Sequence, residues 1–282
     1  MSLEVIVIVL FAALLHASWN FLVKSSEDPY HGMCAVVMGR VPYGLAALLF
    51  SHPAPSSSYV YIVAGALLHV GYQLFLQQGY KFGDLSQVYP MARGSAPLIV
   101  ALVSMTFLGV DYELLQLAAL VMIVGGLISL GLAGYTFTSV QRYTAVLSAF
   151  GAGSFIAAYT LVDGFGARIL GTALGYYSSV TVLNALIYGV VLSRIRPGLV
   201  GQVIRRHYLR ALASGGASFS AYALVVWAFT REPIALVASL RETSIVFSVL
   251  LGVGLLHERL TRLKAMAIAA TVLGVVMLKL GG

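Results

Sequence analysis

The sequence predicts an all-α polytopic membrane protein. Sixty per cent of its 282 residues are hydrophobic and only 10% are charged, and the mean hydropathy is +0.92. A soluble domain carries about 25% charged residues. The apolar residues also form long runs without alternation, which favours membrane helices over the short alternating strands of a membrane barrel.

Ten segments are long and apolar enough to cross a bilayer, which takes about 20 residues of helix. The longest connection, from Ser193 to His207, carries four arginines, and no room remains for a soluble domain. The net charge of +7 would suggest nucleic acid in a soluble chain, but basic cytoplasmic loops explain it here, so no nucleic-acid partner is expected. The predicted spans are 3–23, 32–51, 59–80, 85–107, 113–132, 143–163, 171–193, 208–229, 233–256 and 262–280.

A polar stretch near the middle of the chain separates the predicted spans into five and five. A shift of 148 residues pairs Arg93 with Arg241 and Gly126 with Gly274, and both residue types are scarce in the middle of helices. The sequence therefore indicates an internal duplication. The predicted parts are a first repeat at 1–134, a linker at 135–142 and a second repeat at 143–282.

Each repeat has an odd number of helices, so the second must enter the membrane from the opposite side. The predicted fold is therefore ten transmembrane helices as two inverted five-helix repeats, an architecture typical of secondary transporters. Eleven lysines and arginines fall on the side away from the termini, against Arg168, Arg231 and Lys279 on the side of the termini. This bias predicts that both termini lie outside the cytoplasm.

Several polar residues lie inside the predicted spans and are candidates to line a transport path. The third span carries polar side chains at spacings of three and four residues, which places them along one face. Such a face either forms hydrogen bonds between helices or lines a water-filled cavity, and its length favours the cavity. Its members are His69, Tyr72, Gln73, Gln77 and Tyr80.

Further candidates come from other spans. His16, Trp19 and Asn20 share a face of the first span, and His16 is either a proton-sensitive group or a hydrogen-bonded packing residue. Trp227 is either a cavity platform or a residue of the interfacial aromatic belt. Tyrosines that could add amphipathic walls to a cavity include Tyr89 and Tyr159.

Glycine pairs predict close packing of two helices. Gly125 and Gly126 lie in the fifth span, and Gly215 and Gly216 lie in the eighth. These positions carry no functional prediction.

The chain resembles the ten-helix EamA-type branch of the drug/metabolite transporter superfamily. The resemblance covers the whole chain and rests on the duplicated five-helix unit, on HASWNFLVK at 16–24 and on LHERLT at 256–261. The matching stretch of the first half is LGVDYE at 108–113. Its third residue is Val110, whereas the third residue of LHERLT is a glutamate. The resemblance implies export of small metabolites, often amino acids, by alternating access across the inner membrane of a bacterium. The family also includes carriers of sugars, nucleotide sugars and drugs.

The sequence favours a carrier over other classes of membrane protein. No phosphate-binding loop of the G-x-x-x-x-G-K-[ST] type is present, so the energy must come from the substrate gradient or from a coupled ion. An embedded enzyme needs paired acids or a histidine cluster, and only Glu242 lies deep in a span, with Asp163 near the end of another. A channel would usually show repeated filter residues. No cofactor is expected, and the single cysteine, Cys34, gives neither a disulfide nor a metal cluster.

The arginines inside the spans point to the substrate. An arginine in the middle of a membrane helix is costly and therefore faces the protein interior or water. Arg93 and Arg241 fall at equivalent repeat positions, which predicts a shared cavity near the midplane. Neighbours on a continuous helix point apart, so Glu242 is expected to pair with Arg93 or Arg40 of another helix. That pairing would give the arginines a structural role.

We expect the alternative role for Arg93, which is binding of the substrate's anionic group by a guanidinium fork suited to carboxylates. The buried charges are three arginines and one glutamate, which suits a zwitterion with an apolar side chain or a small organic anion. The expected partners are thus a small molecule of this kind and the lipid bilayer, with the protein acting as a monomer. Other organic anions, sugar derivatives and drugs remain alternative substrates.

Overall fold

The computed structural model describes residues 1–24, 28–51, 54–82, 85–132, 140–247, 250–251 and 262–280. Within these ranges every regular element is a helix, so the expectation of an all-α protein is confirmed. Five helical stretches are long and apolar enough to cross a membrane, which indicates an integral membrane protein. These stretches are Tyr30–Leu49, Ser56–Phe82, Tyr143–Leu170, Ala173–Ile195 and Tyr208–Phe229.

The helices follow the predicted spans, with three main differences. One is that α6 continues to Leu170, seven residues beyond the predicted end of its span. The predicted loop between Ser193 and His207 contains a short helix, α8, and the predicted span 233–256 is interrupted near its centre. The helices are α1 (Leu3–Lys24), α2 (Pro29–Leu49), α3 (Tyr59–Phe82), α4 (Leu85–Phe107), α5 (Leu114–Leu132), α6 (Val140–Leu170), α7 (Ala173–Ile195), α8 (Leu199–Arg206), α9 (Tyr208–Phe229), α10 (Ile234–Arg241) and α12 (Arg262–Leu280), with a 3-10 turn, η1 (Ser56–Ser58), before α3.

Side-chain caps fix where two of the long helices begin. The Asp28 carboxylate accepts a hydrogen bond of 2.9 Å from the backbone N–H of Tyr30 at the start of α2, where Pro29 occupies the first turn. The Thr172 hydroxyl accepts one of 3.4 Å from the Gly175 N–H at the start of α7. Such caps satisfy N–H groups that the helix itself leaves unpaired.

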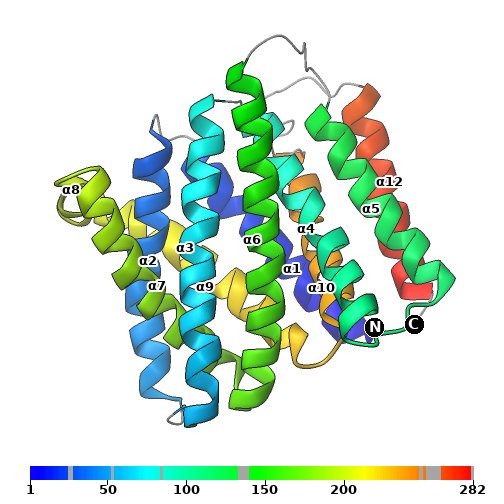
Figure 1. Cartoon of the computed structure of the whole chain (residues 1–282), viewed down its shortest axis with the longest axis horizontal. Coiled ribbons are helices and arrows are strands. Elements are labelled where there is room, and N and C mark those ends of the chain that lie inside the picture. Colours follow the sequence, from blue (N-terminus) through cyan, green and yellow to red (C-terminus); the bar gives the residue numbers. More distant parts are fainter. Residues whose placement is uncertain are drawn as a thin grey trace.

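Helices that are distant in the sequence pack side by side. α3 lies along α6, α5 lies along α12, and α1 and α2 both pack against α9. Helices of the predicted first repeat thus contact helices of the predicted second repeat. The division into repeats stays a prediction, and most of its linker at 135–142 lies outside the described ranges. The two ends of the chain lie at the same end of the helical bundle (Figure 1).

The interruption in the predicted span 233–256 is a tight turn after α10. Glu242 and Thr243 are in a turn, and helix resumes at Ser244. Here the backbone N–H groups of Glu242 and Ile245 each bond to the carbonyl three residues earlier, at 3.1 and 3.0 Å. This three-residue spacing is that of a 3-10 helix, which often marks a functional position inside a longer helix. The predicted continuous helix is thus wrong at these residues.

Two glycines bring the backbones of α2 and α9 together. A Cβ added at Gly39 would lie 1.8 Å from the Ala211 carbonyl oxygen, and one added at Gly215 would lie 2.1 Å from the Gly39 carbonyl carbon. The expectation of close packing at Gly215 is confirmed. At Gly125 it is wrong, because a Cβ there would meet no atom within 4 Å. The approach of α12 to α5 depends instead on Gly274, whose added Cβ would lie 2.9 Å from the carbonyl of Ala119.

We predict that Gly215→Ala lowers the stability of the protein, because the new methyl group meets backbone rather than a movable side chain. Overpacking of this kind costs about 1–3 kcal/mol. Thermal unfolding in detergent measures the effect, with Gly125→Ala in α5 as the matched control. Equal melting temperatures for the two variants would contradict the close approach of α2 and α9.

Candidate functional site

A glutamate shared by two arginines lies at the centre of the candidate site. Arg93 from α4 donates from Nε to Oε2 of Glu242 at 2.5 Å. Arg241, at the end of α10, donates from Nη2 to Oε1 of the same carboxylate at 3.0 Å. The exposed fractions are 2% for each arginine and 0% for the glutamate. Each carboxylate oxygen therefore has its own arginine, as a buried charge requires.

The turn after α10 explains why Arg241 and Glu242 can bond although they are adjacent in sequence. The sequence analysis excludes this pair because neighbours on a continuous helix point apart. The helix ends at Arg241, so the Glu242 side chain leaves in a different direction, and its Oε1 also accepts from Arg241 Nε at 3.2 Å. The pair that helix geometry excludes is therefore present. Glu242 also bonds to Arg93, one of the two partners expected if the arginines have a structural role.

His16 of α1 joins this group through Arg93. The two side chains are 3.0 Å apart, from Arg93 Nη1 to His16 Nε2. A guanidinium only donates, so His16 Nε2 accepts and the ring proton sits on Nδ1. Trp19 packs edge-on against the same imidazole with ring centroids 4.8 Å apart. The predicted residues His16, Trp19, Arg93, Arg241 and Glu242 thus form one cluster, which we call the arginine cluster.

Arg40 of α2 adds a third arginine to the surroundings of His16. All three arginines lie within electrostatic range of His16. Arg40 donates from Nη1 to the Tyr177 hydroxyl at 3.2 Å. Among the described residues, the buried donors Arg40 Nε and Trp19 Nε1 have no hydrogen-bond acceptor. Buried donors of this kind are normally satisfied, so these two are available to an acceptor from outside the chain.

The polar face of α3 is bonded to neighbouring helices. Gln73 Nε2 donates to Asn184 Oδ1 of α7 at 3.1 Å, and Asn184 Nδ2 donates back to Gln73 Oε1 at 3.3 Å. Gln77 Nε2 donates to the hydroxyl of Tyr188, one turn further along α7. Both glutamines are 1% exposed. In this conformation the structure favours the hydrogen-bonding interpretation of these residues over the predicted water-filled face.

His69, the first residue of that face, belongs to a second buried cluster around Asp163. The Asp163 carboxylate is completely buried in α6. Its Oδ2 accepts from the Tyr222 hydroxyl at 2.9 Å and lies 2.9 Å from His69 Nε2. Its Oδ1 accepts from the Tyr176 hydroxyl at 3.0 Å. Four helices, α3, α6, α7 and α9, therefore meet at one carboxylate, which we call the Asp163 cluster.

Stacked aromatic rings connect the two clusters. The Tyr159 ring stacks on His69 with centroids 4.0 Å apart and planes 17° apart, and Tyr72 packs edge-on against Tyr159 at 5.7 Å. The Arg241 guanidinium lies 5.7 Å from the centroid of the Tyr222 ring, within range of a cation–π contact. Tyr222 thus contacts the arginine cluster with its ring and Asp163 with its hydroxyl.

The sequence pattern does not reveal Asp163 and its tyrosine partners. Asp163 falls at the end of the predicted span 143–163, where an acid is unremarkable. The structure extends that helix to Leu170, which puts Asp163 well inside it. An acid within a membrane helix is a functional candidate by default, so a longer predicted span would have revealed it. The tyrosines gave no signal, since tyrosine is common in membrane proteins.

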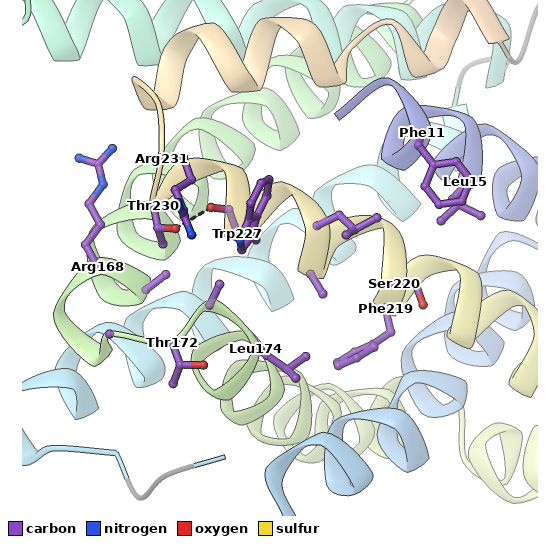
Figure 2. A pocket seen from close by; sticks show the side chains of 15 residues that line it. Phe11, Leu15, Arg168, Thr172, Leu174, Phe219, Ser220, Trp227, Thr230 and Arg231 are labelled. Atoms are coloured by element: carbon purple, nitrogen blue, oxygen red, sulfur yellow. Dashed lines mark hydrogen bonds between the residues drawn. The ribbon is translucent and has the colours of Figure 1, made fainter. Parts of the chain in front are cut away.

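The remaining predicted residues lie elsewhere or are not described. Asn20 belongs to α1 and Tyr89 to α4, but their side chains lie outside what the structure describes. Trp227 lines a cavity of about 800 Å³ between α1, α6, α7 and α9. Figure 2 shows Phe11 and Leu15 at one end of this cavity and Trp227, Thr230 and Arg231 at the other. The Arg231 guanidinium lies 5.4 Å from the Trp227 ring centroid, so the cavity and belt interpretations of Trp227 both stay open.

No family model matches the chain, and no curated protein matches it. Solved structures do match. One of them, described as the crystal structure of a protein, aligns with a TM-score of 0.77 over 98% of this chain and 98% of its own, at 18% sequence identity. A similarity of this extent shows that the two chains share a fold, and at this identity it shows nothing about activity.

We predict that Glu242→Gln destabilises the protein more than Arg93→Gln does. Loss of Glu242 deprives two buried guanidiniums of their shared carboxylate, whereas loss of Arg93 leaves the bond between Arg241 and Glu242 in place. Breaking a buried ion pair costs about 3–5 kcal/mol. Thermal unfolding in detergent gives the order of the two variants, with Glu232→Gln as a control outside the cluster. The reverse order would show that Glu242 is not shared.

Proposed function

We propose that this protein is a secondary transporter of the ten-helix EamA type that exports small metabolites, foremost amino acids, across the inner membrane of a bacterium. It works by alternating access through a central site between two inverted repeats. The observation that carries the proposal is the arginine cluster together with Arg40 beside it. Trp19 Nε1 and Arg40 Nε are buried donors there that have no acceptor among the described residues.

The chemistry of the arginine cluster suits a substrate with a carboxylate. Arg40, Arg93 and Arg241 carry three positive charges against the single charge of Glu242, and all four side chains are buried. An incoming carboxylate reduces this excess, and Arg40 Nε and Trp19 Nε1, which have no acceptor among the described residues, are candidate donors for it. Charge-assisted bonds between guanidinium and carboxylate are among the strongest available to a protein. The Glu242 carboxylate of the same cluster would attract the ammonium group of a zwitterion.

The packing of the helices supports the two inverted repeats. Aligning the repeats equates α1 with α6, α2 with α7, α3 with α9 and α5 with α12. A twofold axis relating such units would turn the contact of α3 with α6 into one of α9 with α1, and both contacts are extensive. It would also bring α2 against its equivalent α7 and α5 against its equivalent α12, as is found.

The turn after α10 is a second feature typical of carriers. Substrate sites of secondary transporters are often built where a membrane helix is discontinuous near the midplane. Here the discontinuity falls at Glu242 and Thr243, beside the charges that we assign to the substrate. A turn also supplies a position where the backbone can change direction as the carrier alternates.

Other functional classes have weaker support. An embedded enzyme would need a nucleophile with its base or a pair of acids. Among the described residues the buried carboxylates are Glu242 and Asp163, and they lie in separate clusters with different partners. A channel is disfavoured because the central polar groups are bonded to one another across helices. The strongest alternative is a carrier of another small organic anion, a sugar derivative or a drug.

We predict saturable counterflow of amino acids with apolar side chains in proteoliposomes that contain the purified protein. Arg93→Gln should still fold and should lose transport. One charge-assisted hydrogen bond contributes about 1.5–3 kcal/mol, so the apparent affinity falls about tenfold or more. Arg194→Gln, at an exposed arginine in the last turn of α7, is the matched control and should transport normally.

Three outcomes would contradict parts of this proposal. If folded Arg93→Gln transports with unchanged apparent affinity, Arg93 does not bind the substrate. If flux rises without saturation, the protein is a channel. If no amino acid is moved while lactate or another organic anion is, the alternative substrate class is correct.

A further inference from the structure

We propose that the cavity beside Trp227 binds one anionic phospholipid, with the phosphate held at Arg168 and Arg231 and an acyl chain lying along α9. This is the cavity of about 800 Å³ between α1, α6, α7 and α9, and we call it the α9 groove. The inference rests on the groove itself and does not depend on which substrate the protein carries.

The walls of the α9 groove belong to surfaces that face the bilayer. Its floor is one face of α9, formed by residues at spacings of three and four along the helix. Phe11 of α1 and Leu174 of α7 line the groove from either side, and both are exposed. Exposed apolar side chains on a membrane helix contact lipid tails, so the groove opens toward the tails. The residues of the floor are Ser220, Ala223, Leu224 and Trp227.

Aromatic rings close the groove on the side of the buried charges. Phe219 lines the groove and is itself buried, at 7% exposure. Its ring stacks on that of Tyr177 with centroids 5.4 Å apart, and the Tyr177 hydroxyl accepts from Arg40. Two stacked rings therefore stand between the groove and the guanidinium of Arg40. In this conformation an apolar occupant of the groove does not compete with a substrate at the arginine cluster.

The outer end of the groove is cationic. Among the described residues that line it, the charged ones are Arg168, in the last turn of α6, and Arg231, just after the end of α9. Figure 2 shows Trp227 and Thr230 beside Arg231 at this end. Tryptophans and arginines near the ends of membrane helices lie at the level of the lipid head groups. A basic site between membrane helices at this level suits an anionic head group.

Both guanidiniums are held in place by contacts that leave donors for a phosphate. Arg168 donates from Nε to the carbonyl of Phe229 at 2.9 Å and from Nη2 to that of Glu232 at 3.0 Å, which uses two of its five N–H groups. The Arg231 guanidinium lies 5.4 Å from the centroid of the Trp227 ring. The neighbouring acid is turned to the start of α1, because Glu232 Oε1 accepts from the Ser2 N–H at 2.6 Å. Arginine binds phosphate through paired, charge-assisted bonds.

The length of the groove matches an acyl chain that hangs from this phosphate. From Trp227 to Ser220 the floor covers seven residues of helix, or about 10 Å. One leaflet contributes about half of the 30 Å hydrocarbon core, so the groove runs from the head-group level through most of a leaflet. A soluble anion would use the cationic end and leave the apolar length empty. The combination of the two favours a phospholipid.

Tryptophan fluorescence tests the proposal, because the chain has two tryptophans and Trp19 is buried away from the groove. The protein is placed in dioleoylphosphatidylcholine vesicles that contain increasing amounts of phosphatidylglycerol with brominated acyl chains, which quench nearby tryptophans. Quenching should saturate well below the bulk share of this lipid, whereas brominated phosphatidylcholine should quench only in proportion to its share. Trp227→Phe should lose the saturable part. Equal quenching by the two lipids would overturn the proposal.

Variants at the two arginines test the head-group end. Arg168→Gln and Arg231→Gln should each lower the preference for brominated phosphatidylglycerol about fivefold, the share of one arginine near a lipid surface. Arg194→Gln, at the opposite end of α7, is the matched control and should leave the preference unchanged. An equal loss in all three variants would show a general effect of protein charge and would contradict a site at Arg168 and Arg231.

A variant that fills the groove separates binding along α9 from attraction at its outer end. Ala223→Leu places a larger side chain on the floor and should abolish saturable quenching with both arginines intact. Ala213→Leu, at an exposed position of the same helix outside the groove, is the matched control. sn-Glycerol 3-phosphate carries the charge without acyl chains and should not reverse the quenching. Full quenching in Ala223→Leu, or reversal by glycerol phosphate, would overturn the assignment to a phospholipid.

Discussion

The arrangement of the site depends on one carboxylate that two arginines share in an apolar interior. Glu242 bonds to Arg93 of α4 and to Arg241, the last residue of α10, and it is fully buried. Moving any of these charges out of water is costly unless each is paired. The pairing requires α10 to end where it does, because a continuous helix would turn Glu242 away from Arg241. The bond between Arg93 and Glu242 also holds α4 beside α10, and the contact of His16 with Arg93 adds α1 to the cluster.

A second carboxylate organises the helices on the other side of the site. Asp163 is held by side chains of α3, α7 and α9, and Gln73 with Asn184 continues these bonds along α3 and α7. Tyr222 contacts both the arginine cluster and the Asp163 cluster, so a change in the charge of one cluster alters the electrostatic environment of the other. Polar groups between membrane helices are often only packing contacts. Here they join the Asp163 cluster to the arginine cluster, through the ring and the hydroxyl of Tyr222.

The sequence predicts the helices well because long apolar runs have one stable form in a bilayer. It also offers the bond between Arg93 and Glu242 as one of two pairings, with Arg40 as the other possible partner, because a buried carboxylate needs a buried cation. It fails where a local backbone change decides the outcome. No proline or glycine lies next to Glu242 and Thr243 that would predict the turn there. Asp163 was overlooked because α6 extends seven residues beyond it, to Leu170, and helix ends are the least certain feature of a predicted span.

The most direct test of the account is a double-mutant cycle between Arg93 and Glu242. The free energies of unfolding of the wild type, Arg93→Gln, Glu242→Gln and the double variant are measured in the same detergent. Because the two side chains are bonded in a buried site, the cycle should give an interaction energy of about 0.5–3 kcal/mol, with the double variant less damaged than the sum of the single ones. Additive effects would contradict the claim that these two charges hold each other inside the membrane.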